Sequence, residues 1–175
     1  MPPPEAAFDG LAADYDTDFT GTAIGRYLRG RAHQRLAQLY SAGNTALELG
    51  CGTGEDALQL VGRGVDVIAT DASYKMLAIA RHKLPNTMRV EYLDLHQLPD
   101  RAFPLLDGAF ANFGVINVLN EYTSLARWLA QHIQPGGVLS FGVMAPYCLW
   151  ELAWHAINGD ISTATRRWRS PATFA

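Results

Sequence analysis

Two kinds of hydrophobic pattern alternate along this chain. Short apolar runs rich in β-branched residues predict strands, and stretches with apolar residues three or four positions apart predict helices. The predicted strands cover residues 45–49, 65–70, 88–93, 106–112 and 138–143. The predicted helices cover residues 22–40, 54–63, 74–84, 122–134 and 150–157, and the fourth of them ends at Pro135-Gly136-Gly137.

Three of these helices have apolar faces that we expect to pack on a sheet. Ser73 stands directly before helix 74–84, where its hydroxyl can cap the first backbone N–H groups. The expected core residues are Ile24, Leu28, Leu36 and Leu39 in the first helix, Ala57, Leu58 and Val61 in the second, and Met76, Leu77 and Ile79 or Ala80 in the third.

The strand–helix alternation from residue 45 onward predicts the fold class. Strands joined by helices form right-handed crossovers, which place the strands parallel and cover both faces of the sheet. We therefore expect a doubly wound, mostly parallel α/β domain with three layers, α/β/α, over residues 44–175. Residues 1–43 are expected to form a helical lid or cap segment at its N-terminal side.

Composition and charge narrow the possible partners. The chain has 14 Lys and Arg against 17 Asp and Glu, a net charge of −3, so nothing suggests a nucleic-acid partner. Its two cysteines, Cys51 and Cys148, have no metal-ligand spacing and fit a reducing compartment. No apolar run reaches the length of a membrane span, and the N-terminus has no signal-peptide pattern. We expect a cytoplasmic protein with no metal.

The run Glu48-Leu49-Gly50-Cys51-Gly52-Thr53-Gly54 is the most informative motif. Glycines at alternate positions after a strand let the backbone turn tightly and approach a ligand closely. The carboxylate of Glu48 repels phosphates but can hold a cationic amino group. Position 55 is Glu where a dinucleotide-binding fingerprint requires glycine, which argues against a pyrophosphate at this helix N-terminus.

Polar residues also follow the other predicted strands. Asp71 follows the second strand, Asp94-Leu95 follows the third, and Asn112 ends the fourth. Ligands of open parallel sheets bind outside these carboxyl ends. Asp71 can accept from both hydroxyls of a ribose, or instead cap the following helix near Ser73. Asp94 can accept from an adenine amino group, or instead form a turn after the strand.

This ordered set, with Pro135-Gly136-Gly137 before the fifth strand, resembles the class I S-adenosylmethionine-dependent methyltransferases over nearly the whole chain. The resemblance implies a Rossmann-like fold and S-adenosyl-L-methionine as cofactor, with S-adenosyl-L-homocysteine as product. Tyr15 resembles the aromatic residue that closes over the donor in small-molecule members, although it can instead simply pack in the lid. The cofactor-binding residues implied are Tyr15, Glu48, Gly50, Cys51, Gly52, Asp71, Ala72, Met76, Asp94, Leu95 and Asn112.

The acceptor is less defined than the donor. The segment after the fourth strand lacks the proline pair of amino-methylating members, which favours a small-molecule acceptor. Tyr147 and His155 are candidate proton acceptors, or else packed side chains, and no catalytic group is identified beyond them. A macromolecular acceptor, or a donor-binding module without methyl transfer, remains an alternative.

The chain departs from the family pattern at its end. Residues 160–175 show no pattern for the antiparallel strands with which the family's sheet finishes. We expect a C-terminally truncated domain, whose uncovered fifth strand favours pairing with a second copy as a homodimer.

Overall fold

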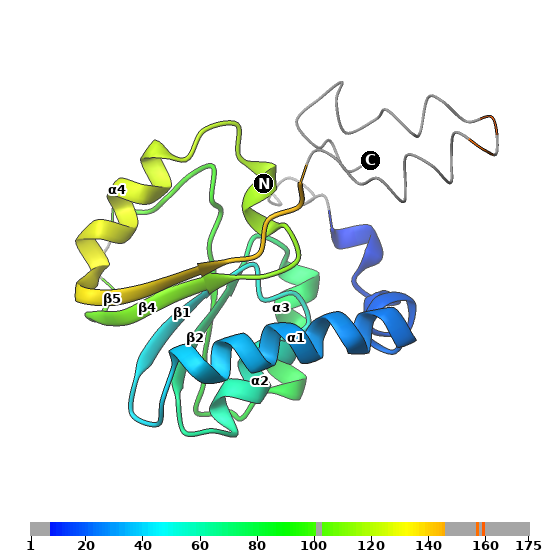
Figure 1. Cartoon of the computed structure of the whole chain (residues 1–175), viewed down its shortest axis with the longest axis horizontal. Coiled ribbons are helices and arrows are strands. Elements are labelled where there is room, and N and C mark those ends of the chain that lie inside the picture. Colours follow the sequence, from blue (N-terminus) through cyan, green and yellow to red (C-terminus); the bar gives the residue numbers. More distant parts are fainter. Residues whose placement is uncertain (1–7, 101–102, 146–156, 158, 160–175) are drawn as a thin grey trace.

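The computed structural model describes residues 8–100, 103–145, 157 and 159. Within them, five parallel strands form one sheet in the order β3-β2-β1-β4-β5 (Figure 1). The strand order reverses between β1 and β4, which places a ligand-binding crevice at their carboxyl ends. The strands are β1 (Thr45–Leu49), β2 (Asp66–Asp71), β3 (Arg89–Tyr92), β4 (Leu106–Ala111) and β5 (Ile133–Phe141).

Helices cover both faces of the sheet. One hydrophobic core joins α1, α2 and α3 to one face, and a second core joins α4 and the short helix η3 to the other. This is the predicted doubly wound α/β fold. The helices are α1 (Ala23–Leu39), α2 (Glu55–Val61), α3 (Tyr74–Lys83) and α4 (Thr123–His132), with short helical turns η1 (Asp9–Leu11), η2 (Asp16–Thr20) and η3 (Val115–Val118).

The N-terminal half of α1 differs from the expected apolar face. Leu36 is buried as predicted, but Ile24 and Leu28 are 60% and 39% exposed. In their place, Gly25 and Arg29 are the buried positions. The reason is that this half of α1 packs along η2 and the start of α2 rather than on the sheet. There Arg29 pairs with Asp56.

The remaining helix faces follow the pattern closely. Ala57 is buried in α2, but Leu60 takes the place expected for Leu58, which is 40% exposed. In α3 the buried residues are Met76, Leu77 and Ala80, and the Ser73 hydroxyl accepts from the Met76 backbone N–H as the predicted cap.

The prediction that Pro135-Gly136-Gly137 separates a helix from the fifth strand is wrong. Helix α4 already ends at His132, and β5 begins at Ile133 and includes these three residues. The pairing with β4 slips between Leu106 and Gly108, so the glycines are accommodated in an irregularity of the strand.

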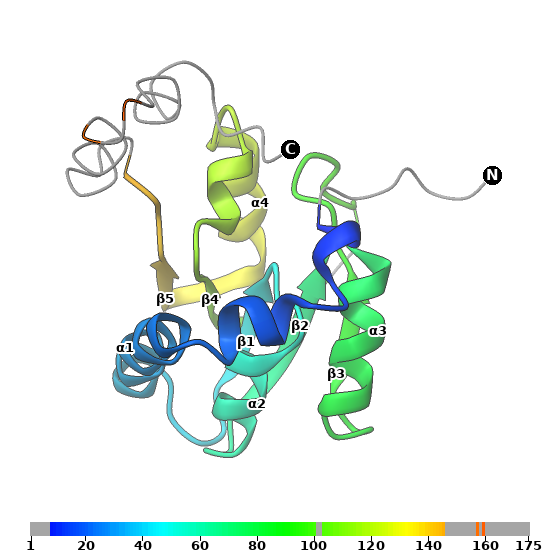
Figure 2. The same cartoon turned by 90° about the vertical axis from the view of Figure 1, so that its right-hand side faces the viewer.

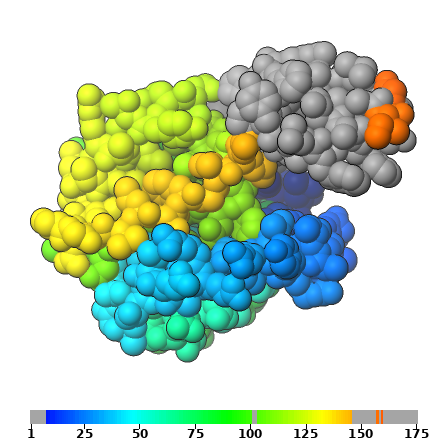
Figure 3. Space-filling view, in the orientation of Figure 1, coloured from blue at the N-terminus to red at the C-terminus, as the bar shows by residue number. Residues whose placement is uncertain are grey.

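Strand β5 is the last strand of the sheet within the described residues. Its Leu139 is 50% exposed, and Figure 3 shows β5 (yellow) on the surface beside α1 (blue). The predicted helix 150–157 and the chain end fall outside the described residues, apart from positions 157 and 159.

Two further expectations concern membranes and domains. No helix among the described residues has the length and apolar character needed to span a bilayer. The boundary at residues 43 and 44 stays a prediction, although Leu36 and Tyr40 share a core with the sheet.

Candidate cofactor site at the carboxyl ends of the strands

The glycine loop after β1 has a left-handed backbone at all three glycines. The φ angles of Gly50, Gly52 and Gly54 are +69°, +53° and +87°. A Cβ at Gly50 would lie 2.5 Å from both methyl groups of Val115, whereas a Cβ at Gly52 would meet only Tyr15 Cε1, at 4.0 Å. The loop is therefore packed tightly at Gly50 and faces Tyr15 at Gly52.

Asp71 holds this loop against the end of β2. Its Oδ2 accepts from the Gly52 backbone N–H at 2.8 Å, and its Oδ1 accepts from the Ser73 N–H at 2.8 Å. Burial raises the pKa of this carboxyl, and hydrogen bonds from backbone N–H groups, including those of Ser73 and Gly52, oppose the rise. Each carboxylate oxygen can still accept a further hydrogen bond, so Asp71 can bind hydroxyls while bracing the loop.

Glu48 lies on the sheet face beneath α1 and α2. The residue is 3% exposed, and its Oε2 has no hydrogen-bond partner among the described residues. Burial raises the pKa of the Glu48 carboxyl well above its usual range, the charges of Asp56 and Asp71 add to the rise, and Arg29 opposes it. A buried acceptor without a partner is costly, which marks this atom as one that a ligand would satisfy.

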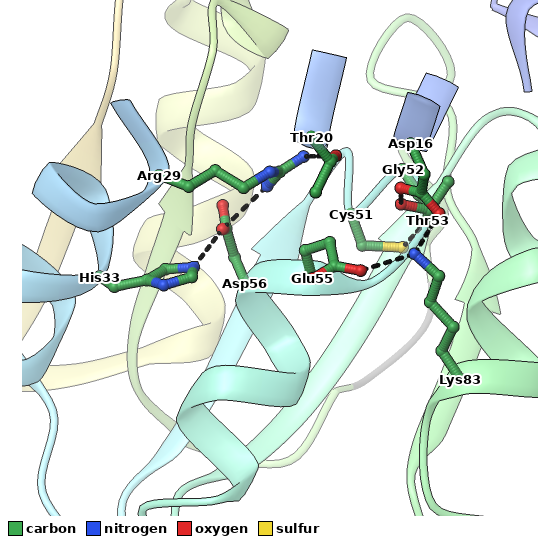
Figure 4. Close-up of polar contacts among 10 residues, drawn as sticks. All are labelled: Asp16, Thr20, Arg29, His33, Cys51, Gly52, Thr53, Glu55, Asp56 and Lys83. Carbon is green, nitrogen blue, oxygen red and sulfur yellow. Dashed lines mark hydrogen bonds and ion pairs between the residues drawn. The ribbon is translucent and has the colours of Figure 1, made fainter. Parts of the chain in front are cut away.

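Asp56, in the first turn of α2, is the centre of a polar cluster that the sequence analysis missed. Its Oδ1 accepts from Arg29 Nη1 at 3.0 Å and lies 2.8 Å from His33 Nε2, while its Oδ2 accepts from Asn112 Nδ2 at 2.8 Å (Figure 4 shows the first two contacts). The signal was present in the sequence, because Arg29 and His33 are four residues apart and so share one helix face.

Arg29 connects this cluster to aromatic side chains. Its guanidinium carbon lies 5.5 Å from the ring centre of Phe19 and 4.9 Å from that of Phe113, and its Nη2 donates to Thr20 Oγ1 at 3.2 Å. Phe113 follows β4 with a φ of +56°, an unusual conformation for a residue with a side chain. The Nε of Arg29, like Glu48 Oε2, is buried without a partner among the described residues.

Residues 8–22, which we call the N-terminal strap, cross the site. At one end the Ser73 hydroxyl donates to Asp9. Further along, Thr53 Oγ1 donates to Asp16 Oδ1 at 2.7 Å, and Lys83 pairs both with Asp16 and, at 2.6 Å, with Glu55. Figure 2 shows the strap (blue) running from α3 to α1. These contacts hold Tyr15 over the glycine loop.

The other predicted cofactor residues lie nearby or on the neighbouring strand end. Cys51 is buried in the loop and its N–H donates to the Thr70 carbonyl at 2.8 Å. Asp94 Oδ1 accepts from the His96 N–H at 2.8 Å, which is the turn expected as its alternative role. Met76 is buried, and Ala72 and Leu95 are half-buried.

Not every predicted site residue can be placed. Tyr147 and His155 fall outside the described residues. Among the residues that the structure describes, no group of three or more His, Cys, Asp or Glu side chains could hold a metal ion.

Comparison with known proteins gives a consistent result. The model of the methyltransferase domain family matches residues 46–137. A demethylmenaquinone methyltransferase of Clavibacter sepedonicus is 32% identical over 136 residues, which cover 75% of this chain and 54% of that protein. The chain spans about half the length of the curated relatives it matches first.

Solved structures agree with this match. A crystal structure of an S-adenosylmethionine-dependent methyltransferase from Mesorhizobium loti is 30% identical with a TM-score of 0.59, covering 72% of this chain and 56% of that one. The complex of DhpI with S-adenosylmethionine and HEP is 30% identical with a TM-score of 0.58, covering 77% of this chain and 61% of that one.

Proposed function

We propose that this chain, which belongs to the class I S-adenosylmethionine-dependent methyltransferases, binds the donor at the carboxyl ends of β1 and β2 for methyl transfer to a small molecule. The observation that carries the proposal is the buried Glu48 Oε2, which has no partner among the described residues. It lies on the strand that opens into three left-handed glycines.

The polar atoms of the site match the amino-acid end of the donor. Among the described residues, the buried Glu48 Oε2 is an acceptor without a partner and the buried Arg29 Nε is a donor without one. The methionine end of S-adenosylmethionine carries an ammonium group and a carboxylate, so one ligand would satisfy both atoms. The glycine at position 52 keeps the backbone free of a side chain on the side that faces Tyr15.

The remaining residues would hold the nucleoside. We assign Asp71 to the ribose hydroxyls and Asp94 with Leu95 to the adenine, with Ala72 and Met76 at its apolar sides. Cys51 and the Gly50 and Gly52 backbones border the methionine part together with Asn112. When bound, the donor supplies an electrophilic methyl group on a sulfonium. The chain contributes alignment and a covered site, which supply much of the rate in a displacement of this kind.

The strap would complete the site over the donor. Tyr15 lies against the open side of Gly52, and the pairs made by Asp16 with Thr53 and Lys83 hold it there. Burial raises the pKa of the Tyr15 hydroxyl, Arg29 opposes the rise and nearby carboxylates add to it, so this phenol stays neutral at ordinary pH. A neutral aromatic cover excludes water without competing for the donor's charges.

The proposed acceptor class rests on two observations. The segment Asn112-Phe113-Gly114 lacks a proline pair, and Phe19 and Phe113 place apolar rings beside the site, 5.2 Å apart. The similar protein from Clavibacter sepedonicus carries the name of a quinone methyltransferase. These support an acceptor with a flat or apolar part.

Ligand titration tests the proposal directly. We expect calorimetry to show micromolar binding of S-adenosylmethionine and S-adenosylhomocysteine to the full chain, with no binding of NAD. Binding of NAD alone would overturn it. A panel of quinols, carboxylic acids, amines and peptides with a labelled methyl donor then identifies the acceptor, and binding without turnover would favour a donor-binding module.

We also propose a homodimer through the outer side of β5. Among the described residues no strand pairs with this side. An open strand edge favours pairing with another chain. Sedimentation of the full chain should show a dimer, and a monomer at high concentration would contradict this.

A further inference from the structure

We propose that Asp56 is a positioning residue for donor binding, because its carboxylate fixes the orientation of Asn112 and of Arg29 beside Glu48. This inference rests on the proposed function, since it assigns a role within the same site. Asp56 itself need not touch the donor. Its side chain is 4% exposed and its two oxygens already accept from three side chains.

The first step concerns the amide of Asn112. An ionised carboxylate can only accept hydrogen bonds, so the Asn112 amide must turn its NH₂ group to Asp56 Oδ2, at 2.8 Å. The carbonyl oxygen of the amide then points away from Asp56. Asn112 follows β4, which pairs with β1 next to Glu48. Asp56 thereby determines that this position presents an acceptor, the group that suits a cationic ligand.

The ionised state of Asp56 is supported by its surroundings. Burial alone would raise the pKa of this carboxyl, but hydrogen bonds from His33 and Asn112 and the charge of Arg29 outweigh it, so the pKa lies below its usual value. Three donors, two from α1 and one from the end of β4, surround this carboxylate and make the cluster specific to the ionised form.

The second step concerns Arg29. Its Nη1 pairs with Asp56 and its Nη2 with Thr20, and the guanidinium lies against Phe19 and Phe113. Only Nε is left without a partner among the described residues. The pair of Arg29 with Asp56 therefore fixes the direction in which Nε can donate. It also joins the strap, through Phe19 and Thr20, to the segment after β4.

The test compares Asp56→Asn with Asp107→Asn in the full chain. Asp107 also accepts hydrogen bonds, from the Thr45 N–H and from Gln134, but at the opposite ends of the strands. Asn at position 56 has nearly the same shape, yet it removes the counter-charge of Arg29 and lets the Asn112 amide turn. We expect the dissociation constant of S-adenosylmethionine to rise about tenfold to a hundredfold in Asp56→Asn and to stay unchanged in Asp107→Asn.

A double-mutant cycle separates positioning from stability. If Asp56 acts through Asn112, then Asp56→Asn must weaken binding less in an Asn112→Ala background than in the wild-type chain. An equal effect in both backgrounds would overturn this role of Asp56, and so would a dissociation constant like that of Asp107→Asn. Thermal melts of each variant identify any that fail to fold, for which Asp56→Glu provides the second test. Absence of binding by the wild-type chain would instead contradict the proposed function.

Discussion

The backbone N–H of Gly52 donates a 2.8 Å hydrogen bond to Oδ2 of Asp71, 19 residues along the chain. This bond fixes the glycine loop after β1 against the end of β2. A loop that is already ordered loses less entropy when a ligand binds. The carboxylate that we assign to a ribose therefore also keeps the loop in its binding conformation.

Asp71→Asn tests this double role. The substitution turns one acceptor into an NH₂ group facing a backbone N–H, so we expect a loss of about 1–3 kcal/mol in stability. Donor affinity should fall about tenfold or more, because charge-assisted bonds to hydroxyls are lost as well. Urea unfolding and calorimetry measure the two effects. Asp66→Asn is the matched control, since Asp66 is exposed at the other end of β2; similar losses there would contradict the assignment.

The glycines of the loop should respond differently to alanine. At Gly50 a Cβ would overlap Val115 at 2.5 Å, so Gly50→Ala should destabilise the fold strongly. At Gly52 a Cβ meets only Tyr15 at 4.0 Å, so Gly52→Ala should cost about 1–2 kcal/mol for its left-handed backbone and mainly weaken donor binding. Thermal melts and titration measure both. A larger loss of stability in Gly52→Ala would show that the packing argument is wrong.

A helical glycine provides the control for these substitutions. Gly30 lies in α1, and a Cβ there would meet nothing within 4 Å. Gly30→Ala should therefore raise stability by about 0.5–1 kcal/mol, because alanine favours the helix. Donor binding should not change.

Glu48 predicts a specific pH dependence. Its pKa in the folded chain is raised above the usual 4.5, by burial first and by Asp56 and Asp71 next. Between the usual and the raised pKa, the folded chain binds more protons than the unfolded chain. The free energy of unfolding therefore falls as pH rises through the raised pKa. Glu48→Gln should remove this part of the slope in urea unfolding at a series of pH values. An unchanged slope would contradict the raised pKa.

The same carboxyl should couple donor binding to protons. A cationic amino group favours ionised Glu48, so binding should release a proton below the raised pKa and tighten as pH rises through it. Calorimetry in buffers with different heats of ionisation measures the release. We expect none in Glu48→Gln, whose affinity should also be lower.

Lys83 tests the strap. Its side chain is 24% exposed and that of Asp16 37%, so Lys83→Met should change stability by about 1 kcal/mol or less. Partial burial raises the pKa of Asp16, but the bonds from Lys83 and Thr53 lower it overall, so the strap contact weakens as pH falls. We expect Lys83→Met to release S-adenosylhomocysteine faster than the wild-type chain in stopped-flow displacement. Arg63→Met, at an exposed cation, is the control, and equal rates would contradict the role of the strap.

The hydrophobic pattern predicted most of the fold. Strand β1 has the expected bounds, and the other predicted strands overlap those observed. These predictions hold because buried parallel strands are apolar on both faces. The errors lie where polar contacts decided the packing: Ile24 and Leu28 are exposed because Arg29 has its partners on the opposite side of α1. The glycines at 136 and 137 were accommodated by an irregular pairing of β5.

The sequence alone determined the glycine loop, the acidic residues after the strands and the family to which they point, because these features are local and their spacing fixes their place at one edge of a parallel sheet. Only the tertiary structure brought Arg29, Asp56 and Asn112 together. They come from α1, α2 and the end of β4, far apart in the chain. Their contacts depend on how two helices pack beside β1, and no local pattern encodes that. The fold likewise decided that Glu48 Oε2 is buried with no partner in the part of the chain that the structure describes, the observation from which a donor site is proposed.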